Sequence, residues 1–153
     1  MEREWIANNN KQRARLKKFV SEITDKELKL VIYKEGWTIA VMLGHLAFWD
    51  ERRLALAKRW RQGDLTRSDI DGVDMHTVND ALVPFFLALP PRTLAELAVN
   101  AAEKLDKELK SLPIDILPRI QAMGDRNALN RGHHRKMHLD EIDAFLKSQR
   151  KKR

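Results

Sequence analysis

The chain has 153 residues, a formal charge of +7 and no cysteine. Such a length suffices for one domain with its own core, and the missing thiols exclude disulfides, thiolate metal sites and a cysteine nucleophile. With 43% hydrophobic and 33% charged residues, no apolar stretch near the roughly 20 residues of a membrane span and no apolar signal-like region at the start, we expect a cytoplasmic protein without a membrane segment.

The first predicted element is an amphipathic helix from about Glu4 to Ile23, because apolar residues recur there at helical spacing. Residues 24–27 (TDKE) resemble a capping box, in which Thr and Glu side chains satisfy free backbone N–H groups at a helix start. We expect this box to open a short helix that reaches Ile32, and Gly36 to end it.

The second long helix is predicted from about Ile39 to Gln62, with Thr38 as its N-cap. Basic residues in its last turn suit the negative end of the helix dipole, and Gly63 is a suitable stop. Residues 64–92 then form a long connection. Its apolar stretch ALVPFFLAL predicts a short helix over one end of the core.

The third long helix is predicted to start at a second capping box, residues 93–96 (TLAE), and to stop before Pro113. Residues 113–124 lie between prolines and a glycine, and we expect one or two helical turns there. The fourth long helix is predicted from about Ala128 to Gln149.

The excess positive charge lies mostly at the C-terminus. The last seven residues, KSQRKKR, carry five positive charges and no acidic residue, so the rest of the chain has a net charge of only +2. Basic termini are usually solvated ends. We therefore expect one domain over residues 1–148 and a basic tail over residues 149–153, and the charge gives little support for nucleic acid as a partner.

Four long helices and no strand pattern predict an all-α protein built as a four-helix bundle. Three short loops would make the second and fourth helices parallel. The 29-residue link over residues 64–92 instead favours a crossover between helices two and three, which makes the second and fourth helices antiparallel. In either arrangement both helices can point side chains inward.

Three of the five histidines are predicted to share the interior. His134 and His138 lie four residues apart and so on one helix face, while His45 shares its face with Met42 and Trp49. Two imidazoles so placed can chelate one metal ion, and a third completes a three-nitrogen site. That site leaves one coordination position free, as catalytic zinc sites do.

The alternative is that each histidine is a hydrogen-bonded core or boundary residue. Three unpaired buried imidazoles must then be neutral and satisfied one by one, whereas one divalent cation satisfies all three. His133 is turned by about 100° from His134 and should face elsewhere. His76 either lines a pocket or caps the short helix. Trp37 and Trp49 bracket His45 and form either a pocket wall or core.

Glu141 is the candidate catalytic residue, because it follows His138 by three positions and His134 by seven and so lies on their face. It could orient a ligand or a metal-bound water, be a fourth ligand, or be an exposed carboxylate near the helix end. Arg135 stands where the zincin motif HExxH has its glutamate, so a metalloprotease mechanism lacks its base.

Two segments together resemble DinB-like proteins, which include metal-dependent thiol transferases and the N-terminal domain of mycothiol-dependent maleylpyruvate isomerase. GWTIAVMLGHLAFWDERRLALAKRW is similar to the family's second helix, and HRKMHLDEI is similar to its fourth. Glu141 stands where many relatives carry glutamine. The residues that match the family's pattern are Trp37, His45, Leu46, His134, His138 and Ile142.

The resemblance implies an up-down-down-up four-helix bundle, often homodimeric, in which His45, His134 and His138 bind zinc, nickel or a similar divalent ion. It also implies a thiol S-transferase or a thiol-dependent isomerase, acting on a low-molecular-weight thiol and an electrophilic substrate. A metal at an open position lowers the pKa of a bound thiol, and this cysteine-free chain needs such a thiol from outside.

Three other functions compete with this one. In a hydrolytic variant, Glu141 is the base for a metal-bound water. In a non-catalytic helical bundle that binds a ligand or a partner, the histidines are only structural, and folding is indifferent to chelators. In a nucleic-acid binder, affinity falls steeply with salt and depends on residues 147–153.

Overall fold

The computed structural model describes residues 2–152, with side chains from Glu4 onward, and every regular element within them is a helix. This confirms the predicted all-α class. None of these helices is long and apolar enough to cross a membrane. The elements are α1 (Glu2–Glu22), α2 (Asp25–Leu28), α3 (Ile39–Arg61), α4 (Gly72–Leu87), α5 (Pro91–Lys110), the 3-10 turn η1 (Ile114–Ile116), α6 (Leu117–Gln121) and α7 (Gly132–Lys151).

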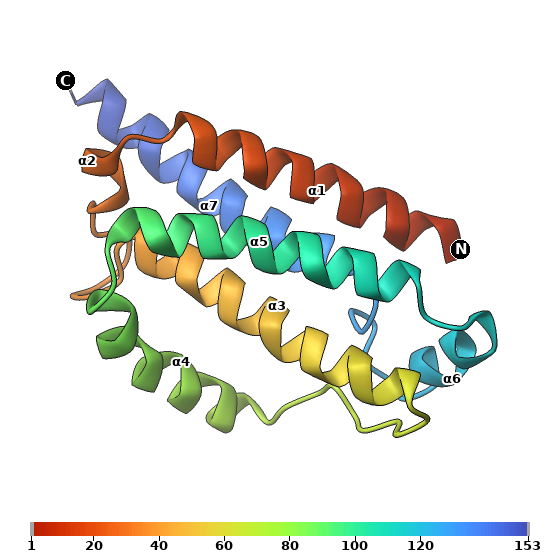
Figure 1. The fold of residues 1–153 in the computed structure, drawn as a ribbon. Helices are drawn as coiled ribbons and strands as arrows, with labels where there is room; N and C mark the ends of the chain where they lie inside the picture. The colour runs from red at the N-terminus through yellow and green to blue at the C-terminus, as the bar shows by residue number, and fades with distance from the viewer. Residues whose placement is uncertain (1, 153) are drawn as a thin grey trace.

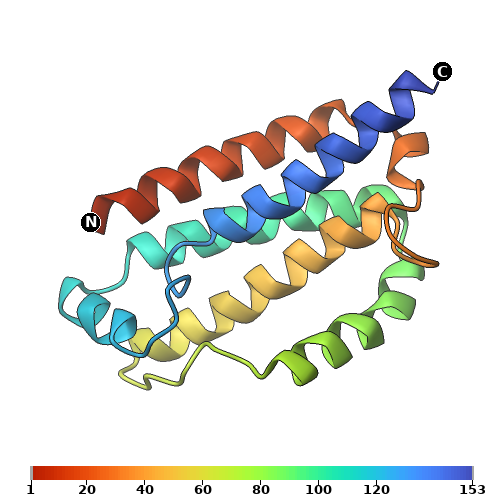
Figure 2. The ribbon, with the colours of Figure 1, turned by 180° about the vertical axis from the view of Figure 1, so that it is seen from behind.

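The four long helices α1, α3, α5 and α7 lie side by side, with α3 and α5 running one way and α1 and α7 the other (Figures 1 and 2). Helix α5 packs against α1 and α3, and α7 packs against α1 and more lightly against α3. The link between α3 and α5 returns along the outside of α3 as α4 (Figure 1). The space between α3, α4 and the start of α7 is where the site is found.

Several predicted helix boundaries are confirmed at the level of hydrogen bonds. The Thr38 hydroxyl accepts from the backbone N–H of Val41 at 3.1 Å and so caps α3. Thr24 and Glu27 form the reciprocal capping box expected for α2. Gly63 follows α3 with φ +87°, a backbone conformation that other residues rarely adopt.

Three predicted boundaries are wrong. The short second helix ends at Leu28 rather than near Ile32, because the chain turns there and Val31 pairs with Thr38 in an isolated antiparallel bridge. Helix α5 starts at Pro91, whose fixed φ suits the first helical turn, so the expected cap at residues 93–96 lies inside the helix. Helix α7 starts at Gly132, four residues later than expected, after turns that lead into it.

Helix α4 is longer than the short helix expected within residues 81–89, and it begins at Gly72. The Asp71 carboxylate starts it by accepting from the backbone N–H groups of Val73 (2.8 Å) and Asp74. None of its residues is buried. Because the helix buries no apolar stripe, its first half lacks the periodicity that would have revealed it.

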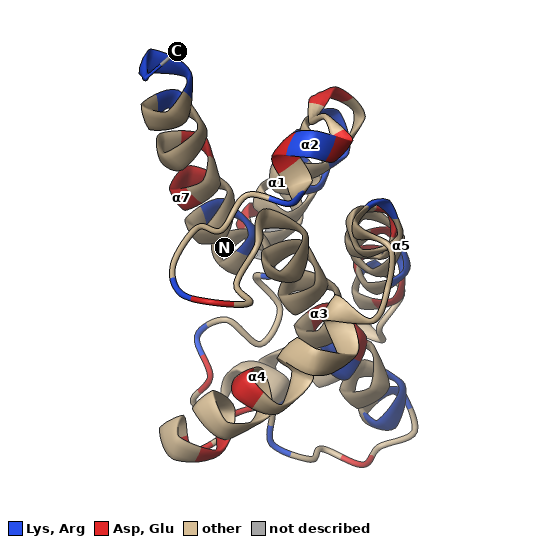
Figure 3. Cartoon of the chain, turned by 90° about the vertical axis from the view of Figure 1, so that its left-hand side faces the viewer, with Lys and Arg blue, Asp and Glu red and all other residues tan. Residues whose placement is uncertain are grey.

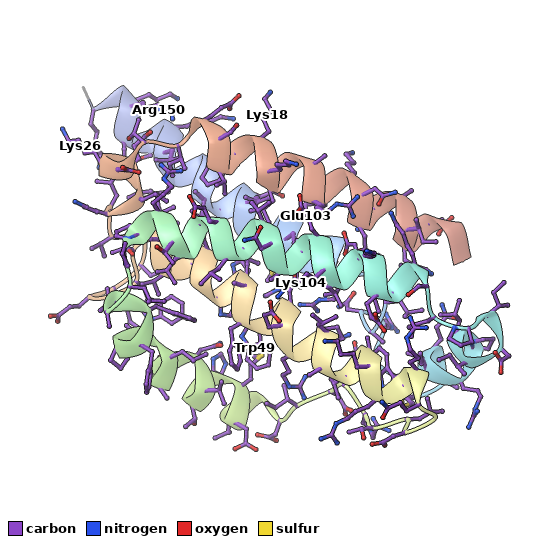
Figure 4. All side chains as sticks on the ribbon, in the orientation of Figure 1. Lys18, Lys26, Trp49, Glu103, Lys104 and Arg150 are labelled. Carbon is purple, nitrogen blue, oxygen red and sulfur yellow. The ribbon has the colours of Figure 1, made fainter. Side chains whose placement is uncertain are left out.

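The basic C-terminal segment continues α7 as far as Lys151. Figure 3 shows Lys and Arg gathered at this end of the helix. Arg150 pairs with Glu27 of α2 at 3.0 Å, and it is labelled in Figure 4. The predicted tail therefore starts within the helix and is held to the neighbouring α2 region through Arg150.

Helix α3 lies at the centre of the molecule. All residues from Ile39 to Leu43 are at most 2% exposed, which requires neighbours on every side of the helix. One apolar cluster surrounds this half of α3, and a second surrounds Trp60 near its other end. Between them lies a layer of buried polar side chains, including Asp50, Asp106 and Arg135.

Candidate metal centre

Three histidines converge where α3 meets the start of α7. His45 comes from α3, and His134 and His138 come from the first turns of α7. The Nε2 atom of His134 lies 3.3 Å from that of His45 and 3.2 Å from that of His138. Zinc–nitrogen bonds of about 2.0–2.1 Å in a tetrahedral site place neighbouring nitrogens about 3.3–3.4 Å apart. These two distances fit neighbouring ligands of one ion, and one ligand atom from each of the three rings lies within 4.8 Å of the other two.

The rings are placed by close packing of α7 on α1. A Cβ atom on Gly132 would lie 2.7 Å from the backbone oxygen of Asn8, so only glycine allows this approach. The backbone N–H of Gly132 donates to the Asn9 side chain at 2.8 Å, which supplies the acceptor that the start of α7 lacks. His134 follows two residues later and is thereby aimed at α3.

Burial keeps all three imidazoles neutral. It lowers the pKa of His138 to about 4. The pKa of His45 falls to about 3, first through burial and then through the neighbouring His138. The pKa of His134 is also well below its usual range, through burial and then the charge of Arg131. Neutral rings have a free nitrogen lone pair at physiological pH, as metal ligation requires.

The outer nitrogen atoms of the three rings have different neighbours. Nδ1 of His45 and Nδ1 of His138 are buried without a hydrogen-bond partner. Nδ1 of His134 lies 3.3 Å from an Arg131 nitrogen, and a guanidinium only donates, so this Nδ1 accepts and the ring proton sits on Nε2. An ion would bind at His134 only after that proton leaves and Arg131 turns away from Nδ1.

Glu141 lies behind His138 rather than among the converging atoms. Its Oε1 is 3.8 Å from Nδ1 of His138, and its Oε2 is buried without a partner. Burial raises the pKa of this carboxyl. The metal-ligating atoms that lie within 4.8 Å of one another come from the three histidines. The position of Glu141 fits the prediction that it orients a ligand, because metal-bound histidines usually donate their other N–H to a carboxylate or carbonyl.

A buried ion network that sequence reasoning missed supports the site. Arg135, with no exposed surface, donates to Asp50 of α3 at 3.0 Å and to both oxygens of Asp106 of α5 at 2.9 Å. Arg131 donates to the other Asp50 oxygen at 3.1 Å. The sequence contained one indication that Arg135 is buried. Arg135 precedes the fully buried Leu139 by four residues and so lies on the apolar stripe of α7.

The histidines border a cavity of about 750 Å³ between α3, α4 and the segment before α7. Trp49 lies in the space between α3 and α4 (Figure 4), and its indole N–H donates to Asn79 of α4 at 2.8 Å. Trp49 lines the cavity, which is one of the two roles expected for it. Trp37, whose ring centroid is 6.1 Å from that of His45, packs in the core.

The two remaining histidines are separate from the converging three. His76 on α4 and His133 on α7 both line the cavity, and both are exposed. Lining a pocket is one of the two roles predicted for His76. His133, which was expected to face elsewhere, lines the same cavity as the three converging rings. Neither belongs to the group of side chains close enough to hold one ion.

Comparison with known proteins gives one result. The family profile of the mycothiol maleylpyruvate isomerase N-terminal domain matches residues 10–134. The match includes His45 and ends at His134, so His138 and Glu141 lie just beyond it. No curated protein and no solved structure matches the chain.

Proposed function

Because the chain belongs to the family of the mycothiol maleylpyruvate isomerase N-terminal domain, which is DinB-like, we propose that it is a metal-dependent enzyme acting on a low-molecular-weight thiol. The reaction is S-transfer of the thiol to an electrophile, or isomerisation of a substrate with the thiol as cofactor. The observation that carries this proposal is the convergence of the Nε2 atoms of three neutral histidines at the wall of a cavity.

His45, His134 and His138 would hold the ion, and zinc or nickel suits three imidazoles. When bound, the ion lowers the pKa of a coordinated thiol, so that the thiolate is available as a nucleophile. Glu141 would accept a hydrogen bond from Nδ1 of His138 and hold that ring in place. Trp49 would limit access of water to one side of the reacting atoms.

The predicted order and direction of the four long helices are also part of this proposal. We interpret the arrangement as an up-down-down-up four-helix bundle with a long crossover between α3 and α5. The opposite directions of α3 and α7 in Figure 1 support it. A single domain over residues 1–148, a homodimeric state and a cytoplasmic location also remain predictions. Exposed apolar residues on α4, such as Val73 and Phe85, are compatible with a second copy.

The test is the metal content of untagged protein, measured by mass spectrometry. We expect close to one transition ion per chain, and loss of that ion in His138→Ala. His133→Ala is the matched control, because this neighbouring histidine is exposed and outside the cluster. Purified protein that takes up no ion even after incubation with zinc or nickel would contradict the proposal.

A non-catalytic ligand-binding bundle is the second candidate. The contact between Arg131 and Nδ1 of His134 favours it, because that contact satisfies the ring without any ion. In that case the three rings are structural, and His138→Ala changes stability but not metal content. If the ion is present, a screen of low-molecular-weight thiols with electrophiles then separates catalysis from simple binding.

A further inference from the structure

We propose that the first part of α4, residues 72–82, is a lid over the cavity, which is hinged near Pro84 and held shut by a hydrogen bond between Trp49 and Asn79. Such a lid controls access to the cavity whatever the cavity holds. It therefore goes beyond the proposed function, and it can be tested in protein stripped of metal.

The first part of α4 forms one wall of the cavity. Met75, His76 and Asn79 line the cavity from α4, while His45 and Trp49 line it from α3. Figure 4 shows Trp49 in the space between these two helices. The cavity, at about 750 Å³, has the size of a small-molecule binding site. Movement of this wall would therefore change access to the histidine cluster.

This wall is loosely packed. None of the residues of α4 is buried, and the least exposed ones in its first part, Met75, Val78 and Asn79, are only partly buried. A helix that belongs to a core normally buries one side completely. Segments with few buried apolar contacts and solvent-exposed backbone hydrogen bonds are those that open most readily.

The second part of α4 is held more firmly. Val83 and Phe86 pack against the apolar cluster around the first half of α3. A Cβ atom on Gly44 of α3 would lie 3.1 Å from the Phe86 ring, so this contact is close. The end of α4 is thus anchored to the core, whereas its first part covers the cavity.

The link before α4 is also anchored, at Ser68. Its backbone carbonyl accepts from Arg52 at 2.8 Å, and its hydroxyl donates to Asp125 at 2.6 Å. Ser68 is buried, but residues 69–71, which join it to α4, have no regular structure. The part of the chain that is free to move therefore lies between Ser68 and Val83.

Pro84 divides α4 where its packing changes. Proline has no backbone N–H, so the carbonyl of Asp80 lacks its partner in the helix, and the proline ring crowds that carbonyl. Helices bend preferentially at such positions. The loosely packed part of α4 is therefore joined to the anchored part by one hydrogen bond fewer than in an uninterrupted helix.

Few polar contacts hold the first part of α4 against the rest of the described chain. The indole N–H of Trp49 donates to the Asn79 side chain at 2.8 Å. Asn79 also lies near His45, where it acts against the lowering of the pKa of that histidine by burial. The ion pair between Lys34 and Asp80, at 3.6 Å, is exposed and contributes little. Because Trp49 is only 9% exposed, its N–H depends on Asn79 as its acceptor.

The test uses the absence of cysteine, which allows two spin labels to be attached at chosen positions. Thr77→Cys places one label on an exposed residue of the lid, and Lys107→Cys places the other on α5, which lies on a different side of α3 from α4 (Figure 3). Pulsed electron paramagnetic resonance then measures the distance between the labels in metal-free protein. We expect a second, longer distance beside the main one.

The share of the longer distance should respond to the latch and to the hinge. Asn79→Ala and Trp49→Phe should each raise it by about threefold or more, because each removes the same hydrogen bond. The two substitutions together should add nothing to either one alone. Pro84→Ala should lower the share, because alanine supplies the N–H that the Asp80 carbonyl lacks.

Two controls are matched to these variants. Ala88→Cys with Lys107→Cys labels the residue at which α4 ends, and this pair should give one distance that Asn79→Ala does not change. Asp74→Asn alters another exposed residue of the lid and should leave the longer distance as it is in the wild-type chain.

Three results would overturn the proposal. One is a single distance for the Thr77 pair that neither Asn79→Ala nor Trp49→Phe changes. Another is a longer distance that also appears for the Ala88 pair, since the whole helix would then move. The third comes from hydrogen exchange. In a lid the amides of residues 76–82 stay protected, because their hydrogen bonds lie within α4. Exchange as fast as in the link over residues 64–71 would instead mean that this part of α4 unfolds. None of these results depends on a bound ion, so the metal-dependent function keeps its own test.

Discussion

At the scale of single residues, the three histidines differ in what lies behind them. His138 has a carboxylate near its outer nitrogen, His134 has a guanidinium, and the outer nitrogen of His45 has no partner. On the inner side, all three rings direct Nε2 toward the cluster. The surroundings behind the three rings therefore differ, and single substitutions behind His134 and behind His138 should have separable effects.

Acid should destabilise the metal-free protein. The folded-state pKa values of His45 and His138 are about 3 and about 4, below the value of about 6.5 in an unfolded chain. Below pH 6.5 the unfolded state therefore binds protons that the folded state does not. Stability is greatest above that pH and falls as the pH drops toward 4, by up to about 1.4 kcal/mol per pH unit for each histidine.

Urea unfolding of chelator-treated protein at pH 7, 6 and 5 measures this slope. His138→Gln should reduce the slope, because glutamine does not titrate. A free energy of unfolding that is constant or rises between pH 6.5 and 5 would mean that the rings are protonated as readily in the folded chain as in the unfolded one.

Glu141→Gln should weaken zinc affinity about 10- to 100-fold, because it removes the charge beside Nδ1 of His138. Competition with a chromogenic chelator measures the affinity. Glu96→Gln is the control, since Glu96 is an exposed glutamate of α5. Unchanged affinity together with lost turnover would assign Glu141 to base catalysis, and unchanged affinity with unchanged turnover would leave it without a role at the site.

At the scale of the helices, the buried ion network joins α3, α5 and α7 close to the histidines. Arg135→Met should destabilise the protein by about 3–5 kcal/mol, because Asp50 and Asp106 would both lose the fully buried guanidinium that they share, although Arg131 stays beside Asp50 and Arg13 beside Asp106. Lys136→Met breaks an exposed pair on the same helix and should cost less than about 1 kcal/mol. Chemical denaturation of both variants compares them, and equal costs would show that the network adds nothing to stability.

The helices that the sequence predicted well are those with an apolar stripe. Helices α1, α3, α5 and α7 each bury one, so their hydrophobic spacing located them to within a few residues. Helix α4 buries none of its residues, and only a local cap marks its start. Its length was therefore not predictable from periodicity, although it forms one wall of the cavity.

The same contrast applies to the site. His134 and His138 belong to one helix, so their shared face followed from their spacing, and His45 was placed by its own apolar neighbours. The partners Arg131 and Asp50 are 81 residues apart in the chain, and helical periodicity carries no information about such pairs.

At the scale of the whole molecule, metal binding should be coupled to folding. An ion that binds only the folded chain stabilises it by about 2.7 kcal/mol when present at 100 times its dissociation constant. For a chain of this size each kcal/mol raises Tm by roughly 2–4 °C. Zinc should therefore raise Tm by several degrees, and a chelator should reverse the change.

Scanning calorimetry with and without zinc measures this shift in wild-type protein, His138→Ala and His133→Ala. The shift should vanish in His138→Ala, which lacks one of the three ligands, and should persist in His133→Ala. Because the three ligands come from α3 and α7, an ion links two helices that otherwise touch only lightly. A Tm that does not respond to zinc or chelator in any variant would mean that these helices are held by the apolar core and the Asp50 network alone, as the non-catalytic alternative requires.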